Sequence, residues 1–548
     1  MNANPTSGPR KSMLAALALV TLAAGSARAQ TPTNEPVAPP VEATPPAPPP
    51  PPPAALAPVP APSPPPAPPL APPAQIPANG GAGSRQPEGN VEPSGAGPNF
   101  ESTWFTRTPL KFTLGSGEQT WSIAFFGTIE ADYITDSTRS YNEIIGGNLV
   151  ARGDTYEGTV GRTQFSMRNT RVGLLLDSPR IAGVTPSAVF QGDFGGNQPG
   201  TPYVIPGAQV GSTISENAYY NSPTFRVRHA YLTLRNPYVD VLAGQTFDVF
   251  GFQNFYTVTS LLGIPNQVST RTAQFRLSRT FGAGGPISLD VALEAARPVQ
   301  RDSQVPDAMA GLRLAVNGWK GITTPGAAVT IAAPLSISVS GVSRQFKLNA
   351  FTPPPAQASN HTTGWGLSVD LFAPIIPAVH ANDRGNRASI VGSFVIGTGI
   401  ADLISAGGNA RFPTLPNSMQ YNPPPAYTAD IDNGLVTFDL FGVAHTIDWY
   451  AFKGGLQYYF PGSGRLLLAG NFSLAHSNNL AKLYPRGGAE IELLGSVANT
   501  SLSTDGTLMW DATPAVRFGI SGQYTQVTYL DGNKPHNIRG IGQALYIF

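Results

Sequence analysis

Residues 287–294 read Ile-Ser-Leu-Asp-Val-Ala-Leu-Glu, so apolar side chains at 287, 289, 291 and 293 alternate with Ser, Asp, Ala and Glu. Successive side chains of a β-strand point to opposite faces, which gives this segment one apolar and one polar face. The same period of two recurs at Leu335–Ser340, Trp365–Leu371 and Ala273–Ser278. Soluble β-sandwiches and outer-membrane barrels both produce this pattern.

Strand length separates these two architectures. Several segments keep the alternation for 10 to 13 residues, as Trp121–Tyr133 does. Strands of soluble sheets average about 5–6 residues, whereas a tilted strand needs about 9–11 residues to cross the hydrocarbon layer. Aromatic residues at strand ends, such as Trp449 and Trp510, also suit the interfacial girdles of a membrane barrel. We therefore predict an all-β fold, a transmembrane antiparallel β-barrel.

The spacing of the segments predicts about sixteen strands, an even number as single-chain bacterial barrels have. Long connections such as 134–163 mostly alternate with short ones such as 236–237, although 317–333 is long for a turn. The predicted strands are 121–133, 164–177, 187–195, 224–235, 238–248, 270–280, 286–297, 307–316, 334–348, 363–372, 387–398, 448–460, 464–476, 503–511, 515–530 and 536–548.

Two segments precede the predicted barrel. Arg10 and Lys11, the apolar stretch Met13–Ala24 and the Ala-Arg-Ala sequence ending at Ala29 have the layout of a secretory signal peptide, residues 1–29. Residues 31–80 contain 23 prolines, so 30–100 is predicted to be a disordered, Pro-rich periplasmic linker. A spacer, or a ligand for a proline-binding or cell-wall-associated partner, is the alternative. Residues 101–548 form the predicted barrel domain.

Composition narrows the chemistry. The chain has no cysteine, which excludes thiolate metal sites and cysteine nucleophiles, and its formal net charge of +1 argues against nucleic acid as a partner. None of the six histidines lies in an H-E-x-x-H motif, and no G-x-S-x-G or Walker A motif occurs. We predict no enzyme activity, no metal and no cofactor. A barrel hydrolase with a non-contiguous serine–histidine site is a weaker alternative, in which His229 is more readily a packed residue than a base.

Several motifs resemble the DcaP-like porins, a trimeric family of sixteen-stranded outer-membrane channels. They are Phe190-Gln-Gly-Asp-Phe-Gly195, Phe225-Arg-Val-Arg-His-Ala-Tyr231 and Ala243-Gly-Gln-Thr-Phe247 with Phe250 after it. The resemblance implies a homotrimer in the lipid bilayer of the outer membrane, acting as a passive diffusion channel for small hydrophilic solutes. It also implies a preference for anionic solutes such as dicarboxylates. Relatives often carry an N-terminal coiled coil, whereas this chain has the Pro-rich segment.

The resemblance extends to the last strand and to one loop. Tyr546 and Phe548 look like the signal that the barrel-assembly machinery recognises, although the expected glycine falls at Gly542, one place off the usual spacing. The loop between Gly251 and Ser269 corresponds to one that folds inward and narrows the pore in relatives, and an ordinary surface loop is the alternative. Its candidate constriction residues are Gln253, Asn254, Tyr256 and Thr257.

Strand parity indicates which charged residues face the lumen, because a cation on the lipid face would cost about 2–4 kcal/mol near the midplane. If these arginines and acids pair with each other across neighbouring strands, they only hold the strand register. If the arginines are unpaired, they form a basic ladder that attracts anions. Residues 101–548 hold 30 basic and 29 acidic groups, so bulk charge does not decide. The candidate pore-lining residues are Arg171, Arg226, Arg228, Arg276, Arg313, Glu130, Asp132, Asp193, Asp290, Glu294 and Asp370.

A second class of function remains open, an adhesin or receptor that binds an external partner through its long loops. The loops concerned are 134–163, 196–223 and 399–447. A pore conducts ions, an adhesin binds without conducting, and a hydrolase loses its activity when its site is mutated. These three behaviours separate the hypotheses.

Overall fold

The computed structural model divides into two units, Met1–Ser84 and Arg85–Phe548, and every described residue belongs to the second. The predicted signal peptide and Pro-rich linker lie outside the described residues. None of the described residues forms a helix that is long and apolar enough to cross a membrane. The structure describes residues 110–116, 119–141, 143, 150–196, 202–203, 211–212, 223–251, 263–300, 303–324, 330–349, 359–378, 383–404, 432, 434–438, 443–483 and 497–548.

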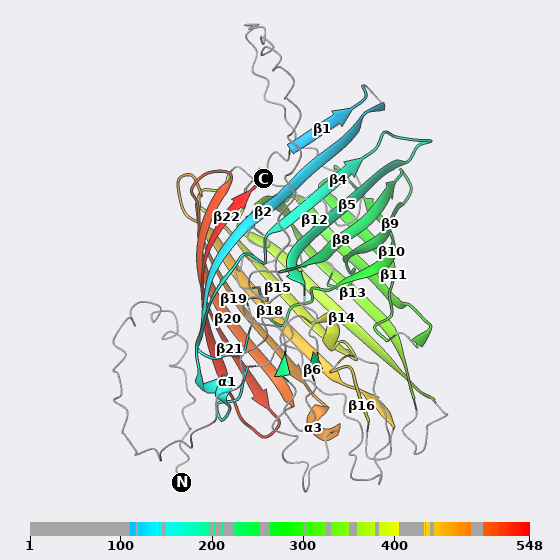
Figure 1. Ribbon diagram of the computed structural model, residues 1–548. Coiled ribbons are helices and arrows are strands. Elements are labelled where there is room, and N and C mark those ends of the chain that lie inside the picture. The colour runs from blue at the N-terminus through cyan, green and yellow to red at the C-terminus, as the bar shows by residue number, and fades with distance from the viewer. Residues whose placement is uncertain are drawn as a thin grey trace, which may run out of the picture. The chain divides into compact units, whose positions relative to one another are not determined.

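One antiparallel sheet contains eighteen strands (Figure 1). Strand β1 (Leu110–Leu114) extends it at one end of β2, and β3 and β4 share one position, which leaves the predicted sixteen positions. The barrel strands are β2 (Trp121–Asp136), β3 (Arg162–Ser166), β4 (Arg171–Asp177), β5 (Thr185–Gly196), β8 (Thr224–Arg235), β9 (Asp240–Phe247), β10 (Arg271–Phe281), β11 (Ile287–Ala296), β12 (Asp307–Thr323), β13 (Ile331–Asn349), β14 (Ser359–Ile376), β15 (Arg387–Thr398), β18 (Asp448–Tyr459), β19 (Leu466–Ser477), β20 (Ala498–Asp511), β21 (Val516–Tyr529) and β22 (His536–Ile547).

The last strand closes the barrel against the first. Strand β22 pairs with β2 from Thr128↔Ile547 to Asp136↔Arg539, and Figure 1 shows the red C-terminal strand beside the blue β2. Beyond this pairing, the backbone of Phe548 exchanges two hydrogen bonds with Gly127. Because β22 pairs with β2, the series of strand pairings from β2 to β22 closes on itself, and each of the sixteen positions has a neighbour on both sides.

The predicted strand 164–177 is interrupted, which the alternation did not reveal. Strand β3 ends at Ser166, paired with Asp132, and β4 begins at Arg171, paired with Thr128. The four residues between β3 and β4 therefore lie opposite three residues of β2. This arrangement is a β-bulge that contains a turn. Strands β12, β13 and β14 are also longer than predicted, and this lengthening shortens the connection expected at 317–333 to residues 324–330.

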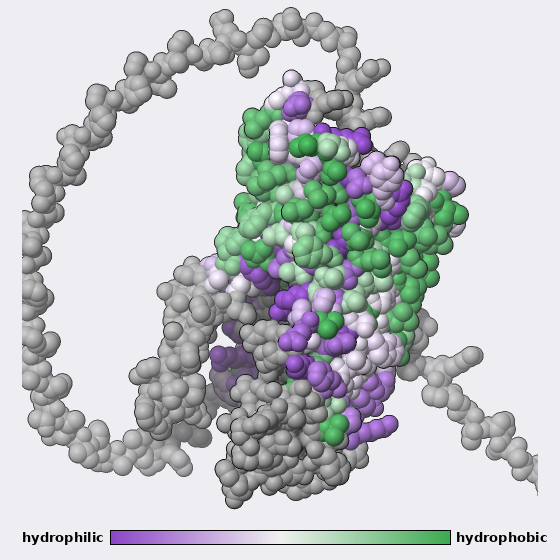
Figure 2. Space-filling model, turned by 90° about the vertical axis from the view of Figure 1, so that its right-hand side faces the viewer, coloured by the Kyte–Doolittle hydropathy of each residue, from purple (hydrophilic) through white to green (hydrophobic). Residues whose placement is uncertain are grey.

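The two faces of the wall differ as the sequence predicts. On β11, Ile287 and Leu293 are 55% and 56% exposed, whereas Asp290 and Glu294 are buried. The same alternation continues around the barrel, and hydrophobic side chains cover much of the outer face that Figure 2 shows. An apolar outer face and a polar inner face are what a barrel in a bilayer requires.

The connection after β2 is fixed at the mouth of the barrel. Arg539 makes a two-point ion pair with Asp136, at 2.7 and 2.8 Å, and its guanidinium lies over the ring of Tyr141. Arg152 donates one hydrogen bond to Asp531 at 2.6 Å and another to Asp154. The bond to Asp154 holds the pKa of that carboxyl group below its usual range. These contacts hold the connection over the ends of β21 and β22.

Candidate functional site, the inner wall of the barrel

All eleven candidate pore-lining residues belong to barrel strands and turn away from the exposed apolar face. Eight are buried and three are half-buried. The buried ones are Glu130, Asp132, Asp193, Arg276, Asp290, Glu294, Arg313 and Asp370, and the half-buried ones are Arg171, Arg226 and Arg228.

Two of the five arginines are matched one-to-one by acids on the next strand. Arg276 lies directly opposite Glu294 and pairs with it at 3.2 Å. Arg313 lies directly opposite Asp290 and pairs with it at 2.5 Å. Directly opposed charges stabilise strand register and cancel each other's field at a distance. These two arginines therefore add no net charge to a basic ladder.

A different arrangement surrounds Asp193 on β5. Its carboxylate is fully buried and accepts hydrogen bonds from Arg226 Nε at 2.9 Å, Arg226 Nη2 at 2.7 Å and Arg228 Nη1 at 2.7 Å. Two arginines only two residues apart in β8 reach one acid because Gly192 pairs with Val227 and Gln191 with His229, which makes Arg228 the extra residue of a bulge. This acid cannot neutralise both guanidiniums.

Two more guanidiniums lie near Asp193. Arg171 is directly opposite Asp193 in the β4–β5 register, and Arg271, at the start of β10, interacts electrostatically with Arg171, Arg226 and Asp193. Within the described part of the chain, neither Arg171 nor Arg271 forms an ion pair. We call Arg171, Arg226, Arg228 and Arg271 the arginine cluster. Two of its guanidiniums bond to Asp193, and the other two form no ion pair among the described residues.

Arg271 was not among the predicted pore-lining residues. Its position in the alternation of β10 matches Ala273 and Phe275, which are exposed on the outer face. The strand begins at Arg271, however, and its guanidinium lies 4.9 Å from the centre of the Phe247 ring. Phe247 is the direct partner of Arg271 in the β9–β10 register, so the two side chains lie on the same face of the sheet.

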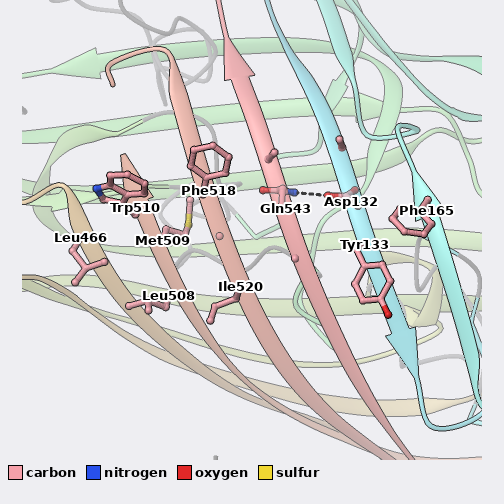
Figure 3. A pocket seen from close by; sticks show the side chains of 14 residues that line it. Asp132, Tyr133, Phe165, Leu466, Leu508, Met509, Trp510, Phe518, Ile520 and Gln543 are labelled. Carbon is pink, nitrogen blue, oxygen red and sulfur yellow. Dashed lines mark hydrogen bonds between the residues drawn. The ribbon is translucent and has the colours of Figure 1, made fainter. Parts of the chain in front are cut away.

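An acidic pair adjoins the arginine cluster. Gln543 Nε2 donates to Glu130 Oε1 at 2.8 Å and to Asp132 Oδ1 at 3.1 Å, and Figure 3 shows the bond to Asp132. Arg171 interacts electrostatically with both carboxyl groups. The inner wall of β22, β2, β4, β5 and β8 thus carries an acidic region next to a basic one.

The wall from β13 to β21 carries many buried hydroxyl groups. Asp370 accepts hydrogen bonds from Ser338 and Ser368, and it interacts electrostatically with Lys453. Hydroxyls can bind a solute in place of water without selecting its charge. The buried hydroxyl residues on this wall include Ser336, Ser338, Ser340, Ser368, Ser389, Ser393, Ser473, Ser503, Thr507, Ser521 and Thr525.

The described ends of the connection between β9 and β10 contact distant parts of the wall. Gly251 N donates to Ser340 Oγ on β13 at 2.8 Å. Asn266 Nδ2 donates to Ser473 Oγ on β19 at 3.4 Å, and Gln523 of β21 donates to Gly263 O at 3.1 Å. The described ends of this connection therefore lie against different parts of the inner wall. The candidate constriction residues Gln253, Asn254, Tyr256 and Thr257 lie outside the described residues.

A groove of about 570 Å³ lies on the opposite, lipid-facing side of the wall. Figure 3 shows it across β19 to β22, β2 and β3, with Trp510, Phe518 and Ile520 on one side and Tyr133 and Phe165 on the other. These outer residues are 43–74% exposed and apolar. The groove belongs to the membrane-facing surface, so it is not a site for a hydrophilic solute.

The described residues contain no group of three or more histidine, aspartate or glutamate side chains placed to hold a metal ion. His229 is buried, its Nδ1 lies 3.0 Å from Thr246 Oγ1, and its ring packs against Tyr231 and Phe247.

A closed sixteen-stranded barrel with an apolar outer face and a polar inner face has the architecture of outer-membrane channels. The chain is similar to the outer membrane channel DcaP of Acinetobacter baumannii, with 15% identity, a TM-score of 0.51 and coverage of 80% of this chain and 99% of that one. The predicted resemblance to DcaP-like porins is confirmed at the level of the fold.

Other solved structures are more distant. An anion-selective porin from Comamonas acidovorans has 9% identity and a TM-score of 0.42 over 78% of this chain and 100% of that one. OprB of Pseudomonas putida has 11% identity and a TM-score of 0.42 over 77% and 94%. No protein-family model matches the sequence, and no curated protein matches it.

Proposed function

We propose that the protein is an outer-membrane porin, a passive diffusion channel for small hydrophilic solutes. The observation that carries this proposal is the closed sixteen-stranded barrel with charged and hydroxyl side chains on its inner face and apolar side chains outside. Transport follows the concentration gradient and uses no cofactor. Residues 1–29 direct export, and residues 30–100 link the barrel to the periplasm.

The proposed solutes are anionic, with dicarboxylates as the class that the family resemblance suggests. The support from the structure is the arginine cluster, where two guanidiniums share Asp193 and two more form no ion pair among the described residues. A local excess of positive charge on the wall of a narrow channel raises the concentration of anions beside it. The acidic pair Glu130 and Asp132 lies next to the arginine cluster. The attraction of anions is therefore confined to the cluster and does not extend over the whole inner wall.

Planar-bilayer recording of the refolded protein tests the proposal. Single-channel steps in symmetric KCl, with a reversal potential in a KCl gradient that favours chloride, are the expected result. Addition of a dicarboxylate such as succinate should block chloride current at millimolar concentration. Conduction with a preference for potassium would keep the porin and refute the anion preference. Inserted barrels that do not conduct would refute the porin and return attention to the adhesin and hydrolase hypotheses.

Assembly forms a second part of the proposal. The chain is proposed to form a homotrimer in the bilayer, and Tyr546 and Phe548 to act as the signal for the barrel-assembly machinery. Tyr546 is exposed on the outer face and stacks on Phe548 at a ring distance of 6.3 Å, so both rings lie together at the closing strand. Native mass spectrometry of the detergent-extracted protein tests the trimer, and a stable monomer would contradict it.

A further inference from the structure

The chain that follows β15 turns into the barrel. Gly399–Ile404 includes a short 3-10 helix, η5 (Ala401–Leu403), and its four apolar side chains are at most 2% exposed. They pack in one apolar cluster with Val249 and Phe250, which follow β9, and with inner-face residues of β11, β12, β13, β15, β18 and β19. An apolar segment buried on the polar side of a membrane barrel needs a specific means of attachment.

Arg344 on β13 supplies that attachment. Its guanidinium donates to Asp307 Oδ2 from Nε at 3.0 Å and from Nη2 at 2.5 Å. It also donates to Asp402 Oδ1 at 2.6 Å, to Asp402 Oδ2 at 3.1 Å and to Gly399 O at 3.0 Å. The Arg344 side chain is 2% exposed. One planar cation thus joins an acid of the wall to an acid and a carbonyl of the inward segment, with all contacts charge-assisted.

Gly366 on β14 lets two inward segments approach the wall closely. A Cβ atom at Gly366 would lie 2.9 Å from Phe250 Cζ and 3.2 Å from Ile400 Cγ2, both closer than ordinary contact. The backbone of Gly366 does not have a positive φ, so the absence of a side chain serves this close approach and not a turn. Phe250 and Ile400 therefore meet over one small patch of the inner wall.

The inward segment also joins the connection between β9 and β10. Val268 and Ile404 form an antiparallel β-bridge, and Ser269 N donates to Leu403 O at 3.4 Å. The neighbouring Gln267 accepts from Lys453 Nζ of β18 at 3.3 Å. A continuous series of contacts thus runs from Arg344 through Gly399–Ile404 to Val268 and on to β18.

Asp248, which follows β9, relates the segment to the arginine cluster. Asp402 interacts electrostatically with Asp248, and Asp248 interacts with Arg271. The apolar cluster occupies the side of β11 to β19, and among the described residues it includes none from β2, β4, β5 or β8. A solute at this level would therefore be directed toward the wall that carries Arg171 and Arg226.

We propose that Gly399–Ile404 is a second constriction element, positioned by Arg344, which narrows the channel together with the described ends of the β9–β10 connection. This inference rests on the proposed porin function. Arg344 is a positioning residue, because it acts through Asp402. The channel width, and with it the proximity of solutes to the arginine cluster, depends on the Arg344–Asp402 contact.

The test is Asp402→Asn, which leaves Arg344 balanced by Asp307 and so keeps the wall free of an unpaired buried charge. We expect single-channel conductance to rise by about twofold and anion selectivity to fall, since a wider lumen weakens the field at its centre. Asp383→Asn, which removes the 2.5 Å rim pair with Arg387, is the matched control and should conduct as wild type does. Gly366→Val is a second variant, which displaces Phe250 and Ile400 without changing charge.

Labelling gives a readout that does not need conduction, because the chain has no cysteine. Leu403→Cys, at a position 1% exposed, should react slowly with a water-soluble maleimide, and about tenfold faster when Asp402→Asn is added. Wild-type conductance in both folded variants, with unchanged labelling, would overturn the second constriction. A wild-type barrel that does not conduct would instead overturn the proposed function and this inference with it, and the wild-type recording distinguishes the two failures.

Discussion

Replacing Arg171 or Arg271 by Gln should weaken anion selectivity without unfolding the barrel. Within the arginine cluster, these two form no ion pair with another described residue. Replacing either one therefore leaves no buried carboxylate without its cation. Arg226→Gln would instead remove a two-point contact from the fully buried Asp193. Arg171 and Arg271 are therefore the variants that change the field of the wall with the least effect on its structure.

The size of the effect follows from Coulomb's law. An anion passing about 6 Å from a guanidinium gains roughly 0.7 kcal/mol at a dielectric constant of 80 and roughly 2.8 kcal/mol at 20. Screening at about 0.1 M salt, with a Debye length near 10 Å, reduces these values to about 0.4 and 1.5 kcal/mol. Each substitution should thus lower the chloride-to-potassium permeability ratio by roughly two- to tenfold.

The assay is the reversal potential in a tenfold KCl gradient, repeated at low and high ionic strength. The shift should shrink at high salt, because screening shortens the reach of each charge. The control is the double variant Arg313→Gln and Asp290→Asn, which removes a matched pair bonded at 2.5 Å and should leave the reversal potential nearly unchanged. A wild-type reversal potential in both single variants, Arg171→Gln and Arg271→Gln, would refute the assignment of selectivity to the cluster.

Three further predictions concern stability and assembly. Arg276→Gln leaves Glu294 buried without its cation and should destabilise the barrel by about 3–5 kcal/mol in urea unfolding, whereas adding Glu294→Gln should restore most of the loss. A Cβ at Gly506 meets nothing within 4 Å, but at Gly127 it would lie 2.3 Å from a carbonyl oxygen. Gly506→Ala should therefore fold as wild type and Gly127→Ala should not, as heat-modifiable gel mobility would show. Deleting Phe548 removes two backbone hydrogen bonds at the closing seam and should lower the yield of folded barrel in cells, and an unchanged yield would contradict its role in assembly.

Much of the architecture could be predicted because it depends on local alternation. The period of two at Ile287–Glu294 fixes which face is apolar wherever the strand lies in the barrel. The same parity placed Arg276 and Asp290 on the inner face, since a lipid-facing charge is costly. Their directly opposed pairing is a matter of register, which a single strand cannot reveal.

The remaining features depend on contacts between distant residues. Arg228 reaches Asp193 because of a bulge, and Arg271 rests on Phe247, its partner in the β9–β10 register. The inward course of Gly399–Ile404 depends on Arg344, which lies 55 residues earlier in the chain than Gly399. No local pattern in a long connection between strands identifies such a partner. The sequence could therefore predict the barrel and the composition of its inner wall, but not the shape of the passage.

Some charged residues of the inner wall stabilise the barrel, and others are available to attract a solute. A carboxylate and a guanidinium that lie directly opposite each other, as Asp290 and Arg313 do, stabilise register and leave little field for a solute. Where one acid faces several arginines, as at Asp193, the surplus charge remains available to an anion. Selectivity in this barrel should therefore depend less on the total number of arginines than on where the pairing is unequal, and a surplus is effective only if the constriction brings solutes close to it.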